Sequence, residues 1–225
     1  MNNVVKFDYP PESCRMQTER SPMNLPLIHV LSILALAATP SLSQGAANGP
    51  NRIDDIVSQR CITCHGPTGQ GSNSQYPKLS GQNVDYLVQQ MFNFKSGARK
   101  STVMAPQLTD LTGEEITRLA RHFSGEKLIP EVTTDKALIE AGREVFMKGN
   151  PDQGVSACAA CHGPTARGGQ MLPRLAGQHA DYIELQLRRF IERSRTTDQT
   201  LMHSVASKMT DAEVRAVSYF LSGLD

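Results

Sequence analysis

Two short segments of the sequence place cysteine and histidine at a spacing that could do chemistry: Cys61-Ile-Thr-Cys64-His65 and Cys158-Ala-Ala-Cys161-His162. Two thiols three positions apart can reach the two vinyl groups on one edge of a porphyrin and form thioethers. The histidine that follows can then supply a nitrogen to the iron. C-x-x-C-H is the attachment signal for c-type haem, so two copies predict two covalently attached haems c, with His65 and His162 as axial ligands.

Zinc and disulfide chemistry also use the C-x-x-C spacing. A zinc site would have two cysteines and one histidine per copy, and its fourth ligand would be missing or shared. A thioredoxin-like site needs a βαβ context, and no stretch of the sequence alternates as a sheet strand would. Two matched copies of the motif therefore favour haem over both alternatives.

The sixth iron ligand is predicted to be a methionine in each copy. Met104 lies 39 residues after His65, and Met202 lies 40 residues after His162, so the two spacings nearly match. Both are expected in loops from which the thioether can point inward. The competing ligand in the second copy is the adjacent His203, which would lower the potential of that haem. We expect His203 on the surface, because its counterpart in the first copy is an alanine.

A ligating histidine needs an acceptor for its other ring N–H. Pro77 follows the first motif and Pro173 the second, each within a Pro-(Lys/Arg)-Leu-x-Gly element. The proline carbonyls are the predicted acceptors, and Leu79 and Leu175 are predicted to cover the haem faces. The alternative is that these elements are simple turns.

The remaining candidates are assigned structural roles. Met91 and Met209 are expected in the hydrophobic core, His122 within a final helix, and His179 in solvent. A cluster of arginines with one glutamate is expected on a helix as a solvated face, although propionate pairing or partner docking are alternatives; it comprises Arg188, Arg189, Glu192, Arg193 and Arg195.

The chain repeats itself at an offset of 96 to 98 residues, and the repeat covers the haem motifs, the Pro-x-Leu elements and the segments that follow them. Such an offset indicates a tandem duplication, and two copies are too few for a solenoid. The predicted organisation has a signal segment, a tether, a first domain, a linker and a second domain, at residues 1–43, 44–50, 51–127, 128–134 and 135–225.

The predicted fold class is all-α. In the first copy a middle helix begins at Val84 and stops at Ser96-Gly97. The last helix of each copy opens with a capping box, Thr112 with Glu115 and Thr210 with Glu213, in which hydroxyl and carboxylate satisfy free backbone N–H groups. Each copy is short and poor in aromatic residues, so its core would be thin without a large group to pack around.

The N-terminal segment predicts export. Residues 25–38 read LPLIHVLSILALAA, an apolar run too short for a membrane span and typical of the hydrophobic part of a secretory signal. Translation could start at Met1 or Met23, and cleavage would remove Cys14. An uncleaved segment would instead hold the chain at a membrane, and a buried helix is the remaining alternative.

Composition narrows the class of partner. The sequence has 23 Lys and Arg against 22 Asp and Glu, a net charge of +1, so it predicts no strong electrostatic field and no nucleic-acid partner. Apolar residues make up 39% of the chain, which fits a soluble globular protein and excludes a polytopic membrane protein.

The whole chain after the signal resembles the dihaem cytochrome c4 family. The segments YPKLSGQNVDYLVQQMFNFKSG and LPRLAGQHADYIELQLRRF carry the resemblance together with the haem motifs. It implies two class I cytochrome c domains in tandem, related by a pseudo-twofold axis, with haem propionates near the interface. The sequence departs from the pattern at Leu172, where the first copy has Tyr76, and at His203-Ser204, where it has Ala105-Pro106.

The resemblance implies a periplasmic electron carrier. With histidine and methionine on both sides, neither iron has an open position, so the predicted function is one-electron transfer and not catalysis. Its partners would be redox proteins: an upstream cytochrome complex or dehydrogenase and a downstream terminal oxidase. The alternatives are a dihaem subunit of a flavocytochrome-like dehydrogenase and, less well supported, a dihaem peroxidase.

Overall fold

The computed structural model describes residues 50–225, with side chains from Arg52 onward. The predicted signal segment, most of the tether and Cys14 lie outside these described residues. Within them the chain is helical, and no strand forms beyond two isolated bridges. No helix in this part of the chain has the length and apolarity that a membrane span requires. The all-α prediction is confirmed.

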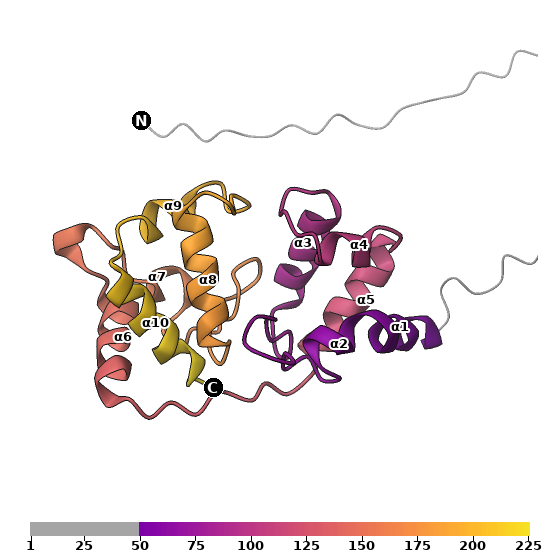
Figure 1. Cartoon of the computed structure of the whole chain (residues 1–225), viewed down its shortest axis with the longest axis horizontal. Helices are drawn as coiled ribbons and strands as arrows, with labels where there is room; N and C mark the ends of the chain where they lie inside the picture. Colours follow the sequence, from indigo (N-terminus) through magenta and orange to yellow (C-terminus); the bar gives the residue numbers. More distant parts are fainter. Residues whose placement is uncertain (1–49) are drawn as a thin grey trace, which may run out of the picture. The chain divides into compact units, whose positions relative to one another are not determined.

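Two groups of helices follow one another along the chain (Figure 1). The first group has six segments: α1 (Pro50–Ile56), η1 (Val57–Cys61), α2 (Ile62–His65), α3 (Val84–Lys95), α4 (Met104–Leu108) and α5 (Gly113–Ser124). The second also has six: α6 (Lys136–Lys148), η2 (Pro151–Gln153), α7 (Ala159–His162), α8 (Ala180–Ile191), α9 (Leu201–Ala206) and α10 (Asp211–Ser222).

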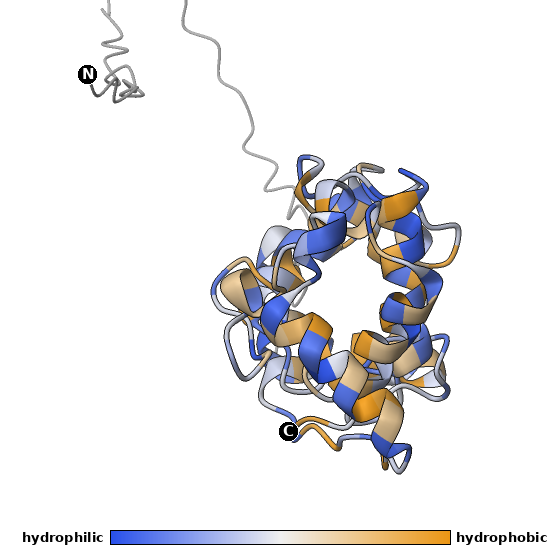
Figure 2. Cartoon of the chain, turned by 90° about the vertical axis from the view of Figure 1, so that its left-hand side faces the viewer, coloured by the Kyte–Doolittle hydropathy of each residue, from blue (hydrophilic) through white to orange (hydrophobic). Residues whose placement is uncertain are grey.

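Each group has its own hydrophobic core. In the first, α3 packs against α5 and α4, and the core includes Ile116, Leu119 and Phe123 from α5. In the second, α10 packs against α6 and α8 around Phe146 and Val217. Figure 2 shows hydrophobic and hydrophilic residues alternating along these helices, the pattern by which an amphipathic helix buries one face.

Both final helices begin with the predicted capping boxes. The Thr112 hydroxyl accepts a hydrogen bond from the Glu115 amide, and the Glu115 carboxylate accepts one from the Thr112 amide. Thr210 and Glu213 repeat the arrangement at the start of α10. The boxes fix where α5 and α10 start, and therefore where the preceding loops must end.

The methionine segments are helical, which corrects the prediction that they are loops. Met104 is the first residue of α4, and Met202 is the second residue of α9. The Ser101 hydroxyl accepts a hydrogen bond from the Met104 amide at 3.0 Å, while the Asp198 carboxylate accepts one from the Met202 amide. These side chains satisfy amides that a short helix leaves free, which is why both segments form a turn of helix.

The approach to α9 is more strained than the approach to α4. In the first domain the left-handed position after α3 is occupied by Gly97, with φ of 78°. Its counterpart after α8 is Arg193, with φ of 58°, and Gln199 and Thr200 are also left-handed. A residue with a side chain is destabilised in this conformation by roughly 1–2 kcal/mol, so the segment that carries Met202 is held less firmly.

We therefore expect a reciprocal exchange at these two positions to have opposite effects. Arg193→Gly should raise the free energy of unfolding by about 1 kcal/mol, and Gly97→Arg should lower it by a similar amount. An added Cβ at Gly97 meets nothing within 4 Å, so backbone strain is the term under test. Denaturant unfolding of the two variants measures it, and equal effects of one sign would contradict the strain argument.

The two domains meet through a reciprocal exchange of hydrogen bonds. The Gln82 amide group donates to the Arg174 carbonyl at 2.8 Å and accepts from the Arg174 amide at 2.7 Å. Gln178 repeats both bonds with Lys78, at 2.9 Å and 2.8 Å. Each glutamine is the repeat counterpart of the other, so the same contact occurs twice in opposite directions. This is the pattern of a twofold interface.

His179 contacts the segment between the two domains, contrary to the expectation that this histidine faces solvent. Its Nδ1 lies 2.7 Å from a Glu131 carboxylate oxygen, and its Nε2 lies 3.0 Å from the Gln70 carbonyl. The His179 side chain is only 12% exposed. Residues 127–135 form no helix. Glu131 joins this segment to the second domain through His179, and the Ile129 amide joins it to the first by donating to the Gln70 side chain at 3.1 Å.

Candidate functional site

The first C-x-x-C-H motif lies in a helical segment that changes its winding at the motif. A π turn, η1, ends at Cys61, and α2 then carries Cys64 and His65. Both motifs end at a glycine with positive φ, Gly66 at 74° and Gly163 at 77°. Because only glycine adopts this extended left-handed conformation freely, the chain turns away directly after each histidine.

The two motif histidines have the same surroundings. His65 and His162 are each 6% exposed. Nδ1 of His65 donates to the Pro77 carbonyl at 3.0 Å, and Nδ1 of His162 donates to the Pro173 carbonyl at 3.3 Å. Since a carbonyl can only accept, the proton is on Nδ1 and Nε2 keeps its lone pair.

Electrostatics favours the neutral imidazole that an iron ligand requires. Burial lowers the pKa of His65 and of His162, and the bonds to the proline carbonyls oppose that shift only in part. No described residue hydrogen-bonds Nε2 of either ring. Each domain therefore presents one buried nitrogen lone pair, oriented by the other nitrogen of the same ring.

The cysteines fit thioether formation. The four are free and partly or fully accessible, and no pair forms a disulfide within the described residues. Burial raises the pKa of the Cys61 and Cys158 thiols to about 11, which disfavours the thiolate that zinc binding or disulfide exchange would use. Within the described residues no three His, Cys, Asp or Glu side chains gather as a metal-ion site would need, so the free thiols beside each histidine fit a covalently attached haem better than zinc.

The methionine candidates differ between the domains. Met104 packs against the first core, as do Cys61 and Leu79. In the second domain Cys158 and Leu175 pack against the core together with Met209, while Met202 is half-buried at the start of α9. Met209 occupies the place that the buried Leu111 has in the first domain, which accords with a core role.

His203 is half-buried, which corrects its assignment to the surface. Its Nδ1 donates to the Phe190 carbonyl at 2.9 Å, so its Nε2 also keeps a lone pair. His203 thus has the tautomer of a ligand and remains the competitor of Met202 for the second site.

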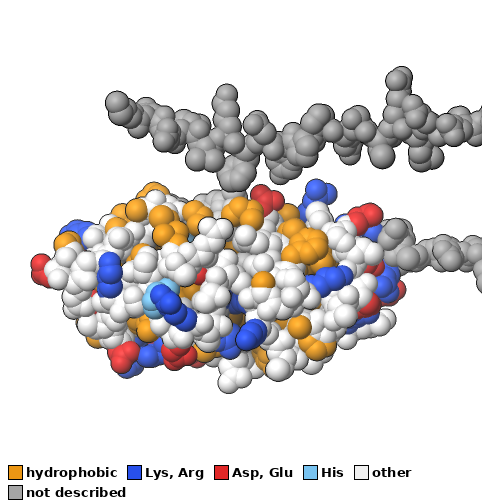
Figure 3. Space-filling model, turned by 90° about the horizontal axis from the view of Figure 1, so that it is seen from above, with side chains coloured by type: hydrophobic (Ala, Val, Ile, Leu, Met, Phe, Trp, Pro, Cys, Tyr) orange, Lys and Arg blue, Asp and Glu red, His pale blue; other side chains and the backbone are white. Residues whose placement is uncertain are grey.

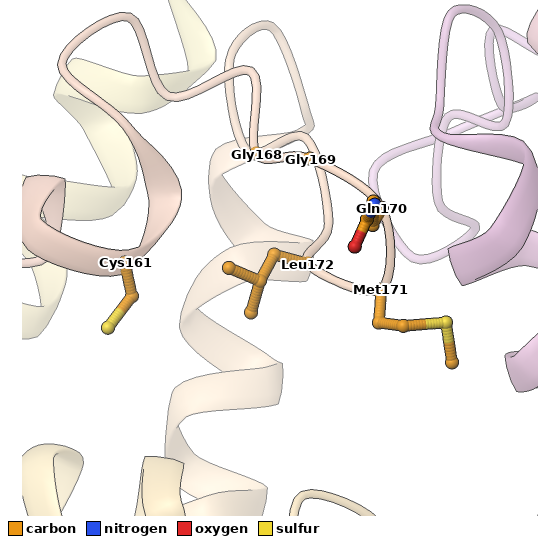
Figure 4. A pocket seen from close by; sticks show the side chains of 6 residues that line it. All are labelled: Cys161, Gly168, Gly169, Gln170, Met171 and Leu172. Atoms are coloured by element: carbon orange, nitrogen blue, oxygen red, sulfur yellow. The ribbon is translucent and has the colours of Figure 1, made fainter.

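One edge of each candidate haem site differs between the copies. In the first domain the Tyr76 ring packs edge-on against His65, with centroids 6.3 Å apart, and a hydrogen bond with Cys64 raises the pKa of the Tyr76 phenol. In the second domain a pocket of about 340 Å³ lies at Cys161, lined by Leu172, Met171 and a glycine-rich turn. Figure 4 shows Leu172 directed toward the Cys161 side and Met171 extending the other way.

The expected arginine cluster is divided by the structure. Arg188 lies on α8 and pairs with Glu184 and Asp211 at 2.8 Å and 2.9 Å. Arg195 lies beyond the end of α8 and is buried at 8% exposure, so it does not belong to a solvated helix face. Sequence reasoning also missed its counterpart, Arg99. The repeat itself could have identified Arg99, because Arg99 and Arg195 are separated by the repeat offset of 96 residues.

The fold and the paired motifs define a c-type cytochrome with two domains. A family model described as cytochrome c matches residues 139–225, and one described as cytochrome c oxidase, cbb3-type, subunit III matches residues 48–122. Cytochrome c domains of this kind carry covalently bound haem c.

Relatives narrow the class further. Cytochrome c4 of Thiocapsa roseopersicina is 38% identical over 168 residues, covering 73% of this chain and 86% of that protein. The crystal structure of reduced cytochrome c4 from Pseudomonas stutzeri superposes with a TM-score of 0.72 at 33% identity, covering 77% of this chain and 96% of the other. A thiosulfate dehydrogenase electron acceptor from Thiomonas intermedia is 39% identical, over 72% of this chain and 77% of that protein. The chain belongs to the cytochrome c4 family of electron-transfer proteins.

Proposed function

We propose that this protein carries single electrons between redox proteins of the periplasm, using two haems c. The thiols of Cys61 and Cys64 attach the first haem, and those of Cys158 and Cys161 attach the second. His65 with Met104, and His162 with Met202, are the proposed axial pairs. When bound, haem supplies the Fe(III)/Fe(II) couple.

The observation that carries the proposal is the duplicated histidine geometry. In each domain one imidazole is buried, neutral, and fixed in one tautomer by a proline carbonyl. Such a ring binds iron without a change of protonation state. A methionine segment at matched spacing in each copy provides a second ligand, so the residues fill both axial positions and leave no place for a substrate.

The surface suits brief encounters with partner proteins. On the face in Figure 3, Lys and Arg side chains are interspersed with Asp and Glu side chains. The net charge of the whole sequence is +1. A mixed surface gives little long-range steering, so docking should be transient and only mildly dependent on salt. The proposed partners are an upstream cytochrome complex or dehydrogenase and a downstream terminal oxidase.

We expect the purified full-length protein to contain close to two haems c per chain, both six-coordinate and low-spin in either oxidation state. Carbon monoxide added to the reduced protein should change the absorption spectrum little. Any carbon monoxide that binds should bind slowly and at the second haem, because the segment that leads to Met202 contains two residues in the left-handed conformation. A pyridine haemochrome assay measures the number of haems, and a carbon monoxide titration measures whether either iron has an open position. A stoichiometry near one, or fast carbon monoxide binding with peroxidase turnover, would overturn the carrier function.

A second candidate function is supported by relatives that are named thiosulfate dehydrogenase electron acceptors, from Thiomonas intermedia and from Stutzerimonas stutzeri. The acceptor of Thiomonas intermedia is 39% identical to this chain, and the cytochrome c4 of Thiocapsa roseopersicina is 38% identical. This protein could therefore serve a dehydrogenase directly, as a dihaem subunit or a dedicated acceptor. Purification from the native cell distinguishes the two: a stoichiometric second polypeptide with a flavin or haem of its own identifies a dehydrogenase complex, and a free dihaem chain identifies the mobile carrier.

A further inference from the structure

Both ring nitrogens of His179 face atoms that accept hydrogen bonds. Nδ1 lies 2.7 Å from a carboxylate oxygen of Glu131, and Nε2 lies 3.0 Å from the carbonyl oxygen of Gln70. A carbonyl oxygen can only accept, and the same holds for an ionised carboxylate. Each contact is therefore a hydrogen bond only if the ring nitrogen carries a proton, and the two together require an imidazolium ion.

The Glu131 carboxyl group is the other place where this proton could reside. Burial would raise the pKa of that carboxyl group, but hydrogen bonds from His179, Ser222 and the Ala180 amide outweigh burial and lower the pKa. The ammonium group of the buried Lys78 also interacts with Glu131 and favours its ionised form. Glu131 is thus a carboxylate at neutral pH, and the proton belongs to His179.

The two hydrogen bonds join three separate parts of the chain. His179 stands at the start of α8 in the second domain, and Gln70 follows the first haem motif. Glu131 belongs to the segment that connects α5 to α6 (Figure 1). Only 12% of the His179 side chain is exposed, and a Cβ added to Gly71 would lie 2.7 Å from Nε2. The ring is therefore enclosed where the three parts meet.

The first domain makes the corresponding contact without a titratable group. Asn83 is the repeat counterpart of His179, and its side-chain amide donates to the Arg167 carbonyl at 3.2 Å and to the Leu172 carbonyl at 2.7 Å. Arg167 is itself the repeat counterpart of Gln70, so the same carbonyl position is used across the interface in each direction. An amide keeps its protons near neutral pH, whereas an imidazolium ion releases one. Of these two contacts, only the one that His179 makes can respond to pH.

Two further charged groups lie on the elements around His179. Lys78, in the loop before α3, donates from Nζ to a carbonyl of the segment between the domains at 2.5 Å. Asp181, on α8 itself, accepts a hydrogen bond from the Ser74 hydroxyl at 2.6 Å. The Lys78 charge opposes a positive charge on the ring, whereas the Glu131 and Asp181 carboxylates favour it. Two carboxylates against one ammonium group make these surroundings favourable to the imidazolium ion.

We propose that His179, with Glu131 and Gln70, forms a pH-sensitive clamp that ties the segment between the domains to both of them. While the ring is protonated, it binds the carboxylate and the carbonyl together. A neutral ring has a single N–H, so loss of the proton breaks one bond and turns a lone pair toward an acceptor.

Linkage between proton binding and folding fixes the sign of the pH dependence. The native state holds a proton on His179, so the clamp stabilises the protein while the ring is protonated, and this contribution is lost as the pH rises and the ring releases its proton. The acid limit comes from Glu131. Because the pKa of that group is lowered, its contribution is fully present above the ordinary value of 4.5 and is lost as the pH falls through the lowered value.

Nitrogen NMR of the reduced full-length holoprotein, labelled with 15N-histidine, tests the protonation state. The His179→Asn variant identifies the His179 signals by their absence. We expect two protonated ring nitrogens at about pH 6 and one bare nitrogen at about pH 9, on either side of the release of the histidine proton. A bare ring nitrogen already present at about pH 6 would overturn the clamp.

Denaturant unfolding of the same holoprotein tests the effect on stability. His179→Asn gives the second domain the residue that the first domain has at this position. Relative to this variant, the folding equilibrium constant of the wild type should fall roughly tenfold as the proton is released, the size expected of one hydrogen bond to a charged group. Asn83→Ala is the matched control, because it removes the corresponding contact without a titratable group, and its effect should be the same at every pH. Identical pH dependence of the wild type and His179→Asn contradicts the clamp.

Glu131→Gln separates the clamp from a general effect of losing the ring. This variant keeps His179 and its bond to Gln70 but removes the charge that holds the proton, so it should reduce the pH dependence by itself, including where His179→Asn does not fold. With both variants folded, the coupling between the two positions in a double-mutant cycle should be present while the ring is protonated and vanish when it is neutral. Unchanged pH dependence in Glu131→Gln, or a coupling that does not change with pH, argues against the clamp.

Discussion

Replacing Met104 with histidine is expected to lower the reduction potential of the first haem by roughly hundreds of millivolts. Axial ligands set haem potentials over a range of about 0.8 V. A thioether favours Fe(II), and a second imidazole favours Fe(III). Met104 packs against the first core beside Cys61, so a ligand at this position acts on one haem only. Spectroelectrochemical titration should show one haem displaced, and the weak near-infrared sulfur-to-iron band should lose the contribution of that haem.

The same substitution at Met202 tests the second domain, where the structure leaves a competitor. Met202→His should displace the second potential, and Met202→Ala should abolish the second contribution to the near-infrared band. Met147→His is the control, because Met147 is an exposed methionine on α6 at 43% exposure. If Met202→Ala leaves the band at full strength, the sulfur ligand is elsewhere, and Met209 is the next candidate. If the wild type shows one methionine-ligated haem and His203→Ala alters the other, His203 is the ligand.

The second large effect is expected at the crossing of α6 and α10. A Cβ added to Gly142 would lie 2.1 Å from the Ala216 carbonyl oxygen and 2.6 Å from Cβ of Phe220. The obstacle is backbone on the facing helix, so the two helices would have to separate. We expect Gly142→Ala to lower the free energy of unfolding by about 3 kcal/mol, the upper part of the usual range for overpacking.

Denaturant unfolding of the full-length holoprotein measures this loss, followed through the haem absorbance of the second domain. Gly169→Ala is the matched control, since an added Cβ there meets nothing within 4 Å, and it should change the unfolding free energy by less than ~0.5 kcal/mol. Equal stabilities of the two variants would mean that the helices can separate at no cost.

The features that the sequence predicted correctly depend on interactions between residues that are close in the chain. The capping boxes, the end of α3 before Ser96, and the helical class all depend on residues within a few positions of each other. The spacing from His65 to Pro77 is likewise short enough that one turn brings the ring to the carbonyl. These contacts can be predicted from the sequence because few backbone angles separate the two partners.

The errors over His179 and Arg195 concern contacts between distant segments, whereas the helical methionine segments were missed although the contacts that start them are local. The sequence predicts His179 in solvent because it stands at the start of a helix, yet its partners, Gln70 and Glu131, lie 109 and 48 residues away. Arg195 was placed on a helix face because α8 was extended past its end, and the burial comes from the other domain. Periodicity within a segment says nothing about which surface a second domain will cover.

The reciprocal glutamine contacts also limit how many copies of this domain one chain can use. Gln82 and Gln178 show that each domain offers the same surface that it receives. Two copies bury such a self-complementary surface completely when they pack together. Repeats that stack head to tail instead leave one surface exposed at the end, where another repeat can pack. Lengthening the chain by a third copy would give a domain with no place to bind. The duplication is closed at two, and a longer array of haems would need a different kind of contact.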